Sequence, residues 1–385
     1  MNNFTYAQPT IIEFGSHILD KAVDIIREKN YQKVLVVAGN HVIKTEEFSE
    51  LKKKMESEGV EVRVFQNVEP NPGTETVDNC AKLARECQAV IGIGGGSVLD
   101  TAKGAAMLAT NEGSIYDYML GRGDSMKAVT NPLLPTIMIP TTSGTGSEVS
   151  ACIVVTDKDR IKDLLLDPKM CPQYAIIDTE LMMTMPEYLA AETGLDVLGH
   201  AIEGMTTVIA TPYSDIQAIE AIKIVFTYLV KSAKEGDEEA RAQMAYASML
   251  AGIAQSVGGC CIPHAMSCPL TIHYGIAHGH AVGICQTAAI RLTKNENADR
   301  YSRIVNYVWP EAGIAEADAA DYLIQKINDL LDELGIRRKY DVEPDDEMLT
   351  KLAEDAQKDD GVNVSAIVPD IDMLKKMYVE VLGGV

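Results

Sequence analysis

Short β-branched runs alternate with amphipathic helical patterns in the first half of the chain, and this alternation constrains the fold more than any other feature. The runs lie between about residues 10 and 185, at residues 33–37, 61–65, 89–93, 136–139 and 175–178. Strands separated by helices are typical of βαβ units, whose strands run parallel. The pattern therefore predicts an α/β domain built on a mostly parallel sheet.

Beyond Pro186 the strand patterns stop and helical patterns continue. Apolar residues there recur at the spacing of one helix face, for example Ile216, Ile219, Ile222, Val225 and Leu229. A chain of 385 residues also exceeds the usual length of one domain. We therefore expect two domains, an α/β domain over residues 1–185 and an all-helical domain over residues 186–385.

Composition narrows the partners and the compartment. The net charge of −22 disfavours nucleic acid and anionic membranes as partners. Neither a leader pattern over residues 1–12 nor a run of about eighteen apolar residues is present, so we expect a cytoplasmic protein. The eight cysteines lack metal-finger spacing, which favours reduced thiols over disulfides.

A glycine turn follows the strand predicted at residues 89–93. It reads Gly94, Gly95, Gly96 and Ser97 and runs directly into a helical pattern. Glycines allow close approach of the backbone, and a helix N-terminus favours a pyrophosphate. The same residues also suit a simple structural turn, with Ser97 as N-cap and Asp100 completing a capping box. Both interpretations can hold at once.

A second loop, over residues 140–148, follows the strand predicted at residues 136–139. It places the hydroxyl groups of Thr141, Thr142 and Thr145 around glycines. Two such loops at neighbouring strand ends would form a better cradle for phosphate and ribose than one. Neither loop has the spacing of a P-loop, which disfavours a nucleotide triphosphatase. The pair predicts a dinucleotide-binding site in the α/β domain.

Asp196 and His200 lie four residues apart in a predicted helix, so their side chains project from one face. An isolated pair of this kind is more often a structural hydrogen bond than a metal site. However, four of the seven histidines fall between His264 and His280, and such clustering is implausible by chance. These histidines make a metal site a serious hypothesis.

A straight helix would separate His264 and His278 by about 21 Å, too far to share an ion. Pro269, Gly275 and Gly279 provide breaks at which the chain could fold back. One aspartate with two or three imidazoles suits Fe²⁺, Zn²⁺ or another divalent metal. Such an ion can act as a Lewis acid on an alcohol or carbonyl.

Taken together, these stretches resemble the iron-containing (group III) alcohol dehydrogenase family over nearly the whole chain. The matching stretches are residues 31–33, 70–72, 94–103 and 140–148, Lys162 before Asp167 and Pro168, residues 194–204, His264, and His278 with Gly279. The resemblance implies a dinucleotide-binding α/β domain followed by an all-α metal-binding domain, the plan also found in dehydroquinate synthase.

The resemblance also implies site residues. Asp196, His200, His264 and His278 would be the four metal ligands and thereby the catalytic set. The coenzyme residues implied by the resemblance are Asn71, Gly96, Ser97, Thr141, Thr142 and Lys162, and we add Gly39, Gly95, Asp100 and Thr145 as candidates. The expected activity is hydride transfer between NAD(P)(H) and a small primary alcohol or aldehyde, in a homo-oligomer of two or more copies.

Three positions depart from the family pattern. Cys268 replaces a histidine credited with proton relay, so His273, His280 or water would take over that role. Gly39 replaces an aspartate that holds the ribose and repels a 2′-phosphate, which favours NADP(H) or use of both coenzymes. Residues 365–367 read Ser-Ala-Ile instead of Asn-Pro-Arg, so the substrate cannot be transferred from a relative.

Other functions stay open at this point. Zinc polyol dehydrogenases of the glycerol type and lyases of the dehydroquinate synthase type share the two-domain plan, although the spacing of Asp196 and His200 favours the iron-type family. Residues 267–271 and 278–282 also resemble a branch that contains phosphonoacetaldehyde reductases. A non-catalytic scaffold relative would be indicated if the protein bound no metal.

Overall fold

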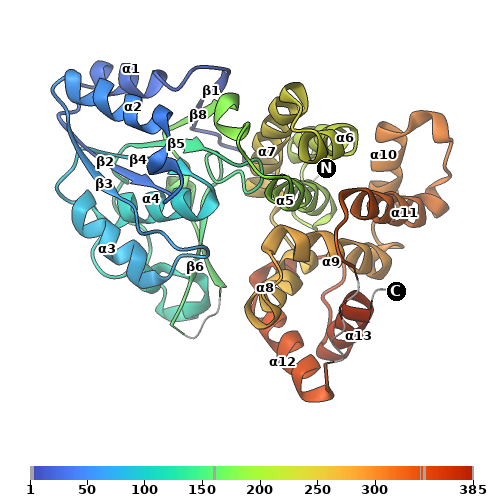
Figure 1. Cartoon of the computed structure of the whole chain (residues 1–385). Helices are drawn as coiled ribbons and strands as arrows, with labels where there is room; N and C mark the ends of the chain where they lie inside the picture. The colour runs from blue at the N-terminus through green and yellow to red at the C-terminus, as the bar shows by residue number, and fades with distance from the viewer. Residues whose placement is uncertain (1–3, 159–161, 339, 341–343, 384–385) are drawn as a thin grey trace. The chain divides into compact units, whose positions relative to one another are not determined.

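The computed structural model describes residues 4–158, 162–338, 340 and 344–383. These residues form two compact units, one spanning Tyr6–Thr184 and the other made of residues 4–5 together with the residues from Met185 onward. In Figure 1 the first unit runs from blue to green and the second from green to red.

A six-stranded parallel sheet forms the centre of the first unit. Its order is β1-β8-β5-β4-β2-β3, with strands β1 (Ile11–Gly15), β2 (Lys33–Ala38), β3 (Glu61–Phe65), β4 (Ala89–Gly94), β5 (Thr136–Pro140) and β8 (Tyr174–Asp178). The predicted α/β fold and all five predicted strands are confirmed. Three strands were not predicted: β1 at the sheet edge, and the antiparallel pair β6 (Cys152–Thr156) and β7 (Lys162–Leu166).

Helices cover both faces of this sheet, as Figure 1 shows. Alternate side chains of a strand point to opposite faces. Val34 and Val36 accordingly join the core beneath α1 (Lys21–Glu28) and α2 (Glu46–Ser57), whereas Leu35 and Val37 join the core with α3 (Thr74–Ala84) and α4 (Gly96–Leu108). Burial on both faces explains why these strands are almost continuously apolar. Short 3₁₀ turns lie at Val42–Lys44, Ile115–Tyr118, Leu120–Ser125, Pro168–Met170 and Thr179–Met182.

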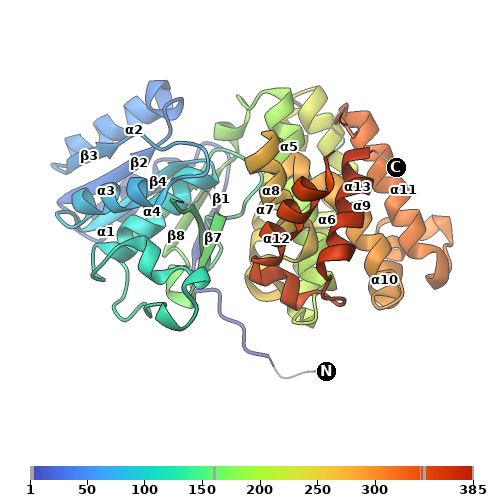
Figure 2. The ribbon, with the colours of Figure 1, turned by 90° about the horizontal axis from the view of Figure 1, so that it is seen from below.

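The second unit is helical throughout the part that the structure describes. Its helices are α5 (Glu187–Thr206), α6 (Pro212–Lys234), α7 (Glu238–Gly258), α8 (Ile262–Tyr274), α9 (His278–Thr293), α10 (Ala298–Val308), α11 (Glu316–Leu334), α12 (Asp346–Gln357) and α13 (Ile371–Gly383), with 3₁₀ turns at Pro310–Ala312 and Asp360–Val364. Helix α5 packs against α6, α7 and α9, and Figure 2 shows α12 and α13 beside α8 and α9. Helix α5 is therefore the central element of this unit.

Two details of the helical unit differ from the sequence-based expectation. The amphipathic pattern correctly predicted α6, but Ile216 is 61% exposed, while the other four apolar residues of its predicted face are buried. The expected chain reversal occurs only at Gly275, which ends α8 in the left-handed conformation with φ 67°. Pro269 lies inside α8, and Gly279 lies in the first turn of α9.

No single helix in the described residues is long and apolar enough to cross a membrane. The bent pair α7 and α8, which meet at 109°, passes that test by length and composition only.

Candidate metal centre and coenzyme site

Three helices bring four potential metal ligands together. Helix α5 carries Asp196 and His200, α8 carries His264, and α9 carries His278. Their Nε2 atoms lie close to a single carboxylate oxygen, Asp196 Oδ1, at 3.9 Å for His200, 3.4 Å for His264 and 3.7 Å for His278. The reversal between α8 and α9 thus brings together two histidines that are 14 residues apart in the chain.

Buried donor atoms of this cluster lack hydrogen bonds. Asp196 Oδ1 and His264 Nε2 have no hydrogen-bond partner among the described residues. Buried polar atoms are nearly always satisfied, so these two call for an additional partner. One carboxylate oxygen and three imidazole nitrogens form a donor set that suits a first-row divalent cation. The residues therefore fit a metal.

The electrostatics keep Asp196 ready to bind a cation. Burial by itself would raise the pKa of Asp196, but the neighbouring charges of His200, His264 and His278 hold that pKa well below its usual range. Burial likewise opposes the charged form of His264, but Cys260, Glu203 and Asp196 hold its pKa well above the usual value. A cation would therefore replace a proton on His264 and meet an ionised Asp196.

Glu203 orients the ligand His264 through Nδ1, the ring nitrogen that does not face Asp196. This buried carboxylate accepts a hydrogen bond from His264 Nδ1 at 2.6 Å, from the Cys261 N–H at 2.6 Å and from Gln286 Nε2 at 3.0 Å. A proton on Nδ1 leaves the lone pair of His264 on Nε2, which faces Asp196. Sequence reasoning missed Glu203, although its place seven residues after Asp196 puts it on the same helix face.

Ser267 orients the imidazole of His278 in the same way, through Nδ1. Its hydroxyl donates to the His264 carbonyl at 2.7 Å, so it can accept from His278 Nδ1 at 3.1 Å. This bond keeps the Nδ1 proton in place and leaves the Nε2 lone pair of His278 on the Asp196 side. Ser267 was also missed by sequence reasoning.

The candidate coenzyme residues follow the carboxyl ends of three neighbouring strands. Gly39 follows β2, the glycine turn follows β4, and Thr141 and Thr142 follow β5. In the sheet, β3 lies beside β2 at one edge, whereas β5 lies on the opposite side of β4, so the direction in which strands are added reverses between β2 and β4. Ligands of open parallel sheets bind at such a reversal, outside the carboxyl ends of the strands. The topology thus places these residues where a dinucleotide would bind.

The start of α4 differs from its predicted capping. Gly95 is the N-cap, and no side chain caps the helix, so the expected capping box of Ser97 and Asp100 is wrong. Ser97 Oγ instead accepts a hydrogen bond from the Asn71 N–H at 3.2 Å. Asp100 accepts from Ser147 Oγ at 2.6 Å and from the Val154 N–H at 3.0 Å. The Asp100 carboxylate therefore has its hydrogen-bond partners within the protein, and its bond to Ser147 holds the loop over residues 140–148 in place.

The two loops are packed against each other. A Cβ atom built on Gly96 would lie 2.5 Å from Thr145 Cγ2, so only glycine fits there. The fully buried Lys103 of α4 donates to the backbone carbonyls of Ser147 at 2.9 Å and Ser150 at 3.0 Å. The glycine turn and the loop over residues 140–148 thus form one tightly packed surface around the N-terminus of α4.

The remaining coenzyme candidates border the same surface. Asn71, in the left-handed conformation with φ 53°, accepts a bond from Thr156 Oγ1 at 3.1 Å, and Thr156 pairs with Lys162 across β6 and β7. Gly39 adjoins α4, since a Cβ built on it would lie 3.7 Å from Val98 Cγ2. The structure therefore gathers candidates from five segments around one helix N-terminus.

The two other histidines near the metal ligands make contacts elsewhere. His273 Nε2 lies 3.2 Å from Asp355 Oδ2, and His280 Nε2 lies 2.8 Å from both the Arg337 carbonyl and Tyr340 Oη. Neither histidine belongs to the four-ligand cluster. No disulfide joins any of the eight cysteines, all of which lie in the described residues.

Glu148 is the last residue of the loop over residues 140–148. Its titration makes the free energy of unfolding depend on pH. Burial raises its pKa from the ordinary 4.5 to about 7. A raised pKa contributes stability that is present below the unfolded value and is lost as pH rises through about 7. We expect wild type to lose about 3 kcal/mol relative to Glu148→Gln between pH 4 and pH 8.

Calorimetric unfolding of both proteins across that pH range measures the difference. Glu112→Gln, at an exposed position, is the matched control and should follow wild type. Parallel stability curves for wild type and Glu148→Gln would contradict the prediction.

A parallel sheet with glycine- and threonine-rich loops at its carboxyl edge, together with a buried carboxylate and three imidazoles that fit a divalent ion, is typical of metal-dependent oxidoreductases that use a dinucleotide. Residues 9–179 match the family model described as iron-containing alcohol dehydrogenase, and residues 190–380 match the C-terminal model of that family. The chain belongs to the iron-containing alcohol dehydrogenase family and is an oxidoreductase that acts on CH–OH groups.

Individual relatives agree with this family. The chain is 32% identical to the NAD-dependent methanol dehydrogenase of Bacillus methanolicus, with 98% of this chain and 99% of the relative covered. Among solved structures, a 1,3-propanediol oxidoreductase matches with a TM-score of 0.92 and 28% identity, covering 99% of this chain and 100% of that one. A sulfoacetaldehyde reductase from Bifidobacterium kashiwanohense, in complex with NAD⁺, matches with a TM-score of 0.89 and 32% identity, covering 99% of each chain.

Proposed function

We propose that this protein interconverts small aldehydes and primary alcohols with NAD(P)(H), using Fe²⁺ or another divalent ion held by Asp196, His200, His264 and His278. The observation that carries the proposal is the approach of three imidazole Nε2 atoms to the one buried oxygen Asp196 Oδ1. A structural aspartate–histidine pair would need neither the second and third imidazoles nor an unbonded carboxylate oxygen.

The bound ion supplies a Lewis acid for the oxygen of the substrate. The protein's own groups do the positioning: Glu203 and Ser267 hold the imidazoles of His264 and His278 with their Nε2 lone pairs toward Asp196. In the reductive direction, bound NAD(P)H would supply the hydride for the carbonyl carbon, and one proton would be added to the oxygen. The products are the alcohol and NAD(P)⁺.

We propose that water provides this proton. Cys268 stands where the family carries its relay histidine, so no imidazole is available at that position to pass a proton. The Nε2 atoms of His273 and His280 already contact Asp355 and the Arg337 carbonyl.

The proposed coenzyme is NADP(H), or both coenzymes, because Gly39 offers no carboxylate to repel a 2′-phosphate. A side chain fits at this position, since the built Cβ makes only ordinary contacts. We expect Gly39→Asp to lower the ratio of kcat/KM with NADPH to kcat/KM with NADH by about tenfold or more, through charge repulsion. Gly39→Asn, of equal size without the charge, is the control; an unchanged ratio in the aspartate variant would contradict the coenzyme proposal.

A second candidate is a reductase of phosphonoacetaldehyde, favoured by the sequence of residues 267–271 and 278–282. A zinc polyol dehydrogenase of the glycerol type is the remaining enzymatic alternative. We further propose that the protein is cytoplasmic and homo-oligomeric, for which the acidic composition and the family membership are the support.

The test is turnover by protein purified anaerobically and loaded separately with Fe²⁺ and Zn²⁺. NADH and NADPH oxidation would be followed with propanal, lactaldehyde, phosphonoacetaldehyde and sulfoacetaldehyde, and coenzyme reduction with glycerol. Metal-dependent reduction of an uncharged aldehyde supports the main proposal, whereas turnover confined to phosphonoacetaldehyde or to glycerol selects one of the alternatives. Absence of turnover with every metal and substrate would refute the proposal and favour a lyase or a non-catalytic relative.

A further inference from the structure

We propose that Cys260 supplies a thiolate ligand to the ion at this metal centre, so that the site binds Zn²⁺ through sulfur as well as nitrogen. The inference rests on the metal centre of the proposed function. It adds a ligand that lies outside the set of Asp196, His200, His264 and His278.

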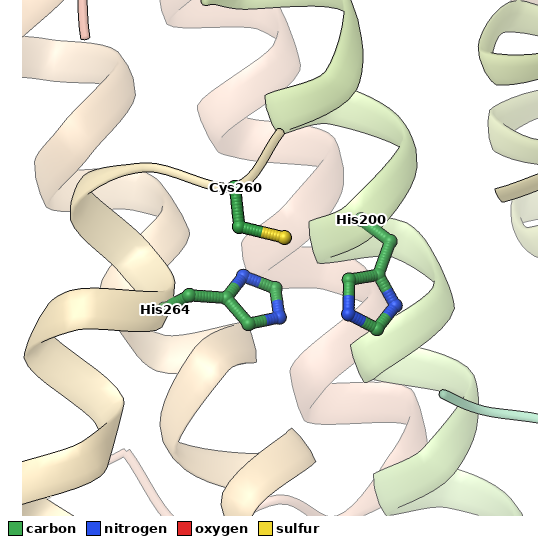
Figure 3. A group of neighbouring side chains, drawn as sticks. All are labelled: His200, Cys260 and His264. Carbon is green, nitrogen blue, oxygen red and sulfur yellow. The ribbon is translucent and has the colours of Figure 1, made fainter. Parts of the chain in front are cut away.

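Cys260 lies in the turn between α7 and α8, and its Sγ points toward the imidazoles of His200 and His264 (Figure 3). The thiol sulfur and one nitrogen of each imidazole lie within 4.8 Å of one another. The two rings are stacked with their centroids 4.5 Å apart. Zinc bonds to sulfur and nitrogen measure about 2.3 and 2.0 Å, so donors of one ion lie within this range of separations.

The group that contains the Cys260 sulfur shares His264 with the described centre, which links the two sets of donors. Asp196, His264 and His278 make up a second group of donors within 4.8 Å, and His264 belongs to both groups. Because Glu203 holds His264 Nδ1, the imidazole has a lone pair for only one ion, at Nε2. The unbonded, buried atoms His264 Nε2 and Asp196 Oδ1 point independently to that same ion.

The backbone holds Cys260 in place. The N–H of the next residue, Cys261, donates to Glu203 Oε2 at 2.6 Å, so the carboxylate that orients His264 also anchors the turn that carries the thiol. The Cys260 thiol itself makes a weak bond of 3.3 Å to the neutral Gln255 Oε1. On metal binding the S–H bond breaks, its proton passes to solvent, and a sulfur–metal bond forms.

A thiolate changes which ion the centre prefers. Sulfur is a soft donor that favours Zn²⁺ or Co²⁺ over the harder Fe²⁺ and Mn²⁺. Two anionic ligands, Asp196 and Cys260, also balance the two positive charges of the ion, which lowers the cost of burying it. Within the described part of the chain, Cys260 is the one cysteine in either donor group.

The experiment uses the full chain loaded with Co²⁺ in place of the native ion. Bound Co²⁺ gives visible d–d absorption with any ligands, and a thiolate bound to it adds an intense charge-transfer band in the near ultraviolet. We expect both in wild type, and loss of the near-ultraviolet band alone in Cys260→Ser. Cys268→Ser, which removes a half-buried thiol from the same helical region, is the control and should keep both.

Competition with a chromophoric chelator gives a second readout. The ratio of Zn²⁺ affinity to Mn²⁺ affinity should fall by about tenfold or more in Cys260→Ser, and stay at the wild-type value in Cys268→Ser. Wild type that shows d–d absorption without the near-ultraviolet band would refute the thiolate ligand and leave the metal centre standing. Wild type that binds no Co²⁺ would refute both proposals. The wild-type spectrum is decisive even if the serine variant fails to fold.

Discussion

Asp196→Asn is expected to lower the affinity for Fe²⁺ and Zn²⁺ by at least about a hundredfold, because loss of a ligand should exceed the 10–100-fold effect of the groups behind it. We also expect kcat/KM to fall by about 1,000-fold, which corresponds to losing several kcal/mol of Lewis-acid stabilisation. Asp196 Oδ1 is the one carboxylate oxygen that the three imidazoles approach. Asparagine keeps the shape and removes the charge, so the fold should persist.

Metal content after gel filtration, chelator competition and steady-state kinetics measure these effects. Asp215→Asn is the matched control, since Asp215 is also a buried aspartate of the helical unit and pairs instead with Arg300 and Arg303. That control should lose stability and keep one metal ion per folded chain. A variant with asparagine at 196 that retains wild-type metal content would show that the cluster is a structural network.

Gly279→Ala is expected to weaken metal binding by at least about tenfold without altering a ligand. A Cβ built on Gly279 would lie 1.9 Å from the backbone carbonyl oxygen of Glu192 and 3.2 Å from Asp196 Cβ. A backbone carbonyl within a helix cannot rotate away, so α9 must move from α5 and take the neighbouring His278 with it. Overpacking of this kind costs about 1–3 kcal/mol or more of stability.

Gly283→Ala, one turn further along α9, separates this effect from a general glycine effect. The atom nearest to its built Cβ is Leu195 Cδ1, at 3.0 Å, which a rotamer change can move, and the contact with Leu195 Cβ at 3.3 Å is milder than the backbone clash at Gly279. We expect this control to keep metal affinity near wild type, measured by the same chelator competition. Equal metal affinities in Gly279→Ala and wild type would mean that the approach of α9 to α5 does not position His278.

Burial explains why the central strands could be predicted, although the partly exposed edge strand β3 was predicted as well from its β-branched residues. The strands at the centre of the sheet are buried on both faces and therefore appear in the sequence as apolar β-branched runs, which made them predictable. Strand β1 lies at the edge with Ile11 half exposed, so its short sequence carries no such signal. The pair β6 and β7 lies outside the main sheet, and its sequence likewise carries no clear strand signal.

The capping of α4 failed for a different reason. The spacing of Ser97 and Asp100 matches a capping box, which is a local pattern. In the structure, Asn71, Ser147 and Val154 provide the partners of these two side chains, and the nearest of them is 26 residues away along the chain. Local pattern reasoning cannot anticipate competition from such distant groups.

For the metal centre, the sequence alone determined the chemical types of the donors and the shared helix face of Asp196 and His200, because the helical period is a local property of the chain. Only the tertiary structure decided that His264 and His278 approach Asp196, that Glu203 orients one of them, and that the Cys260 sulfur lies beside two imidazoles. These contacts join α5, α8, α9 and the turn before α8. Their geometry depends on how the helices pack, and packing is set by residues far apart in the chain.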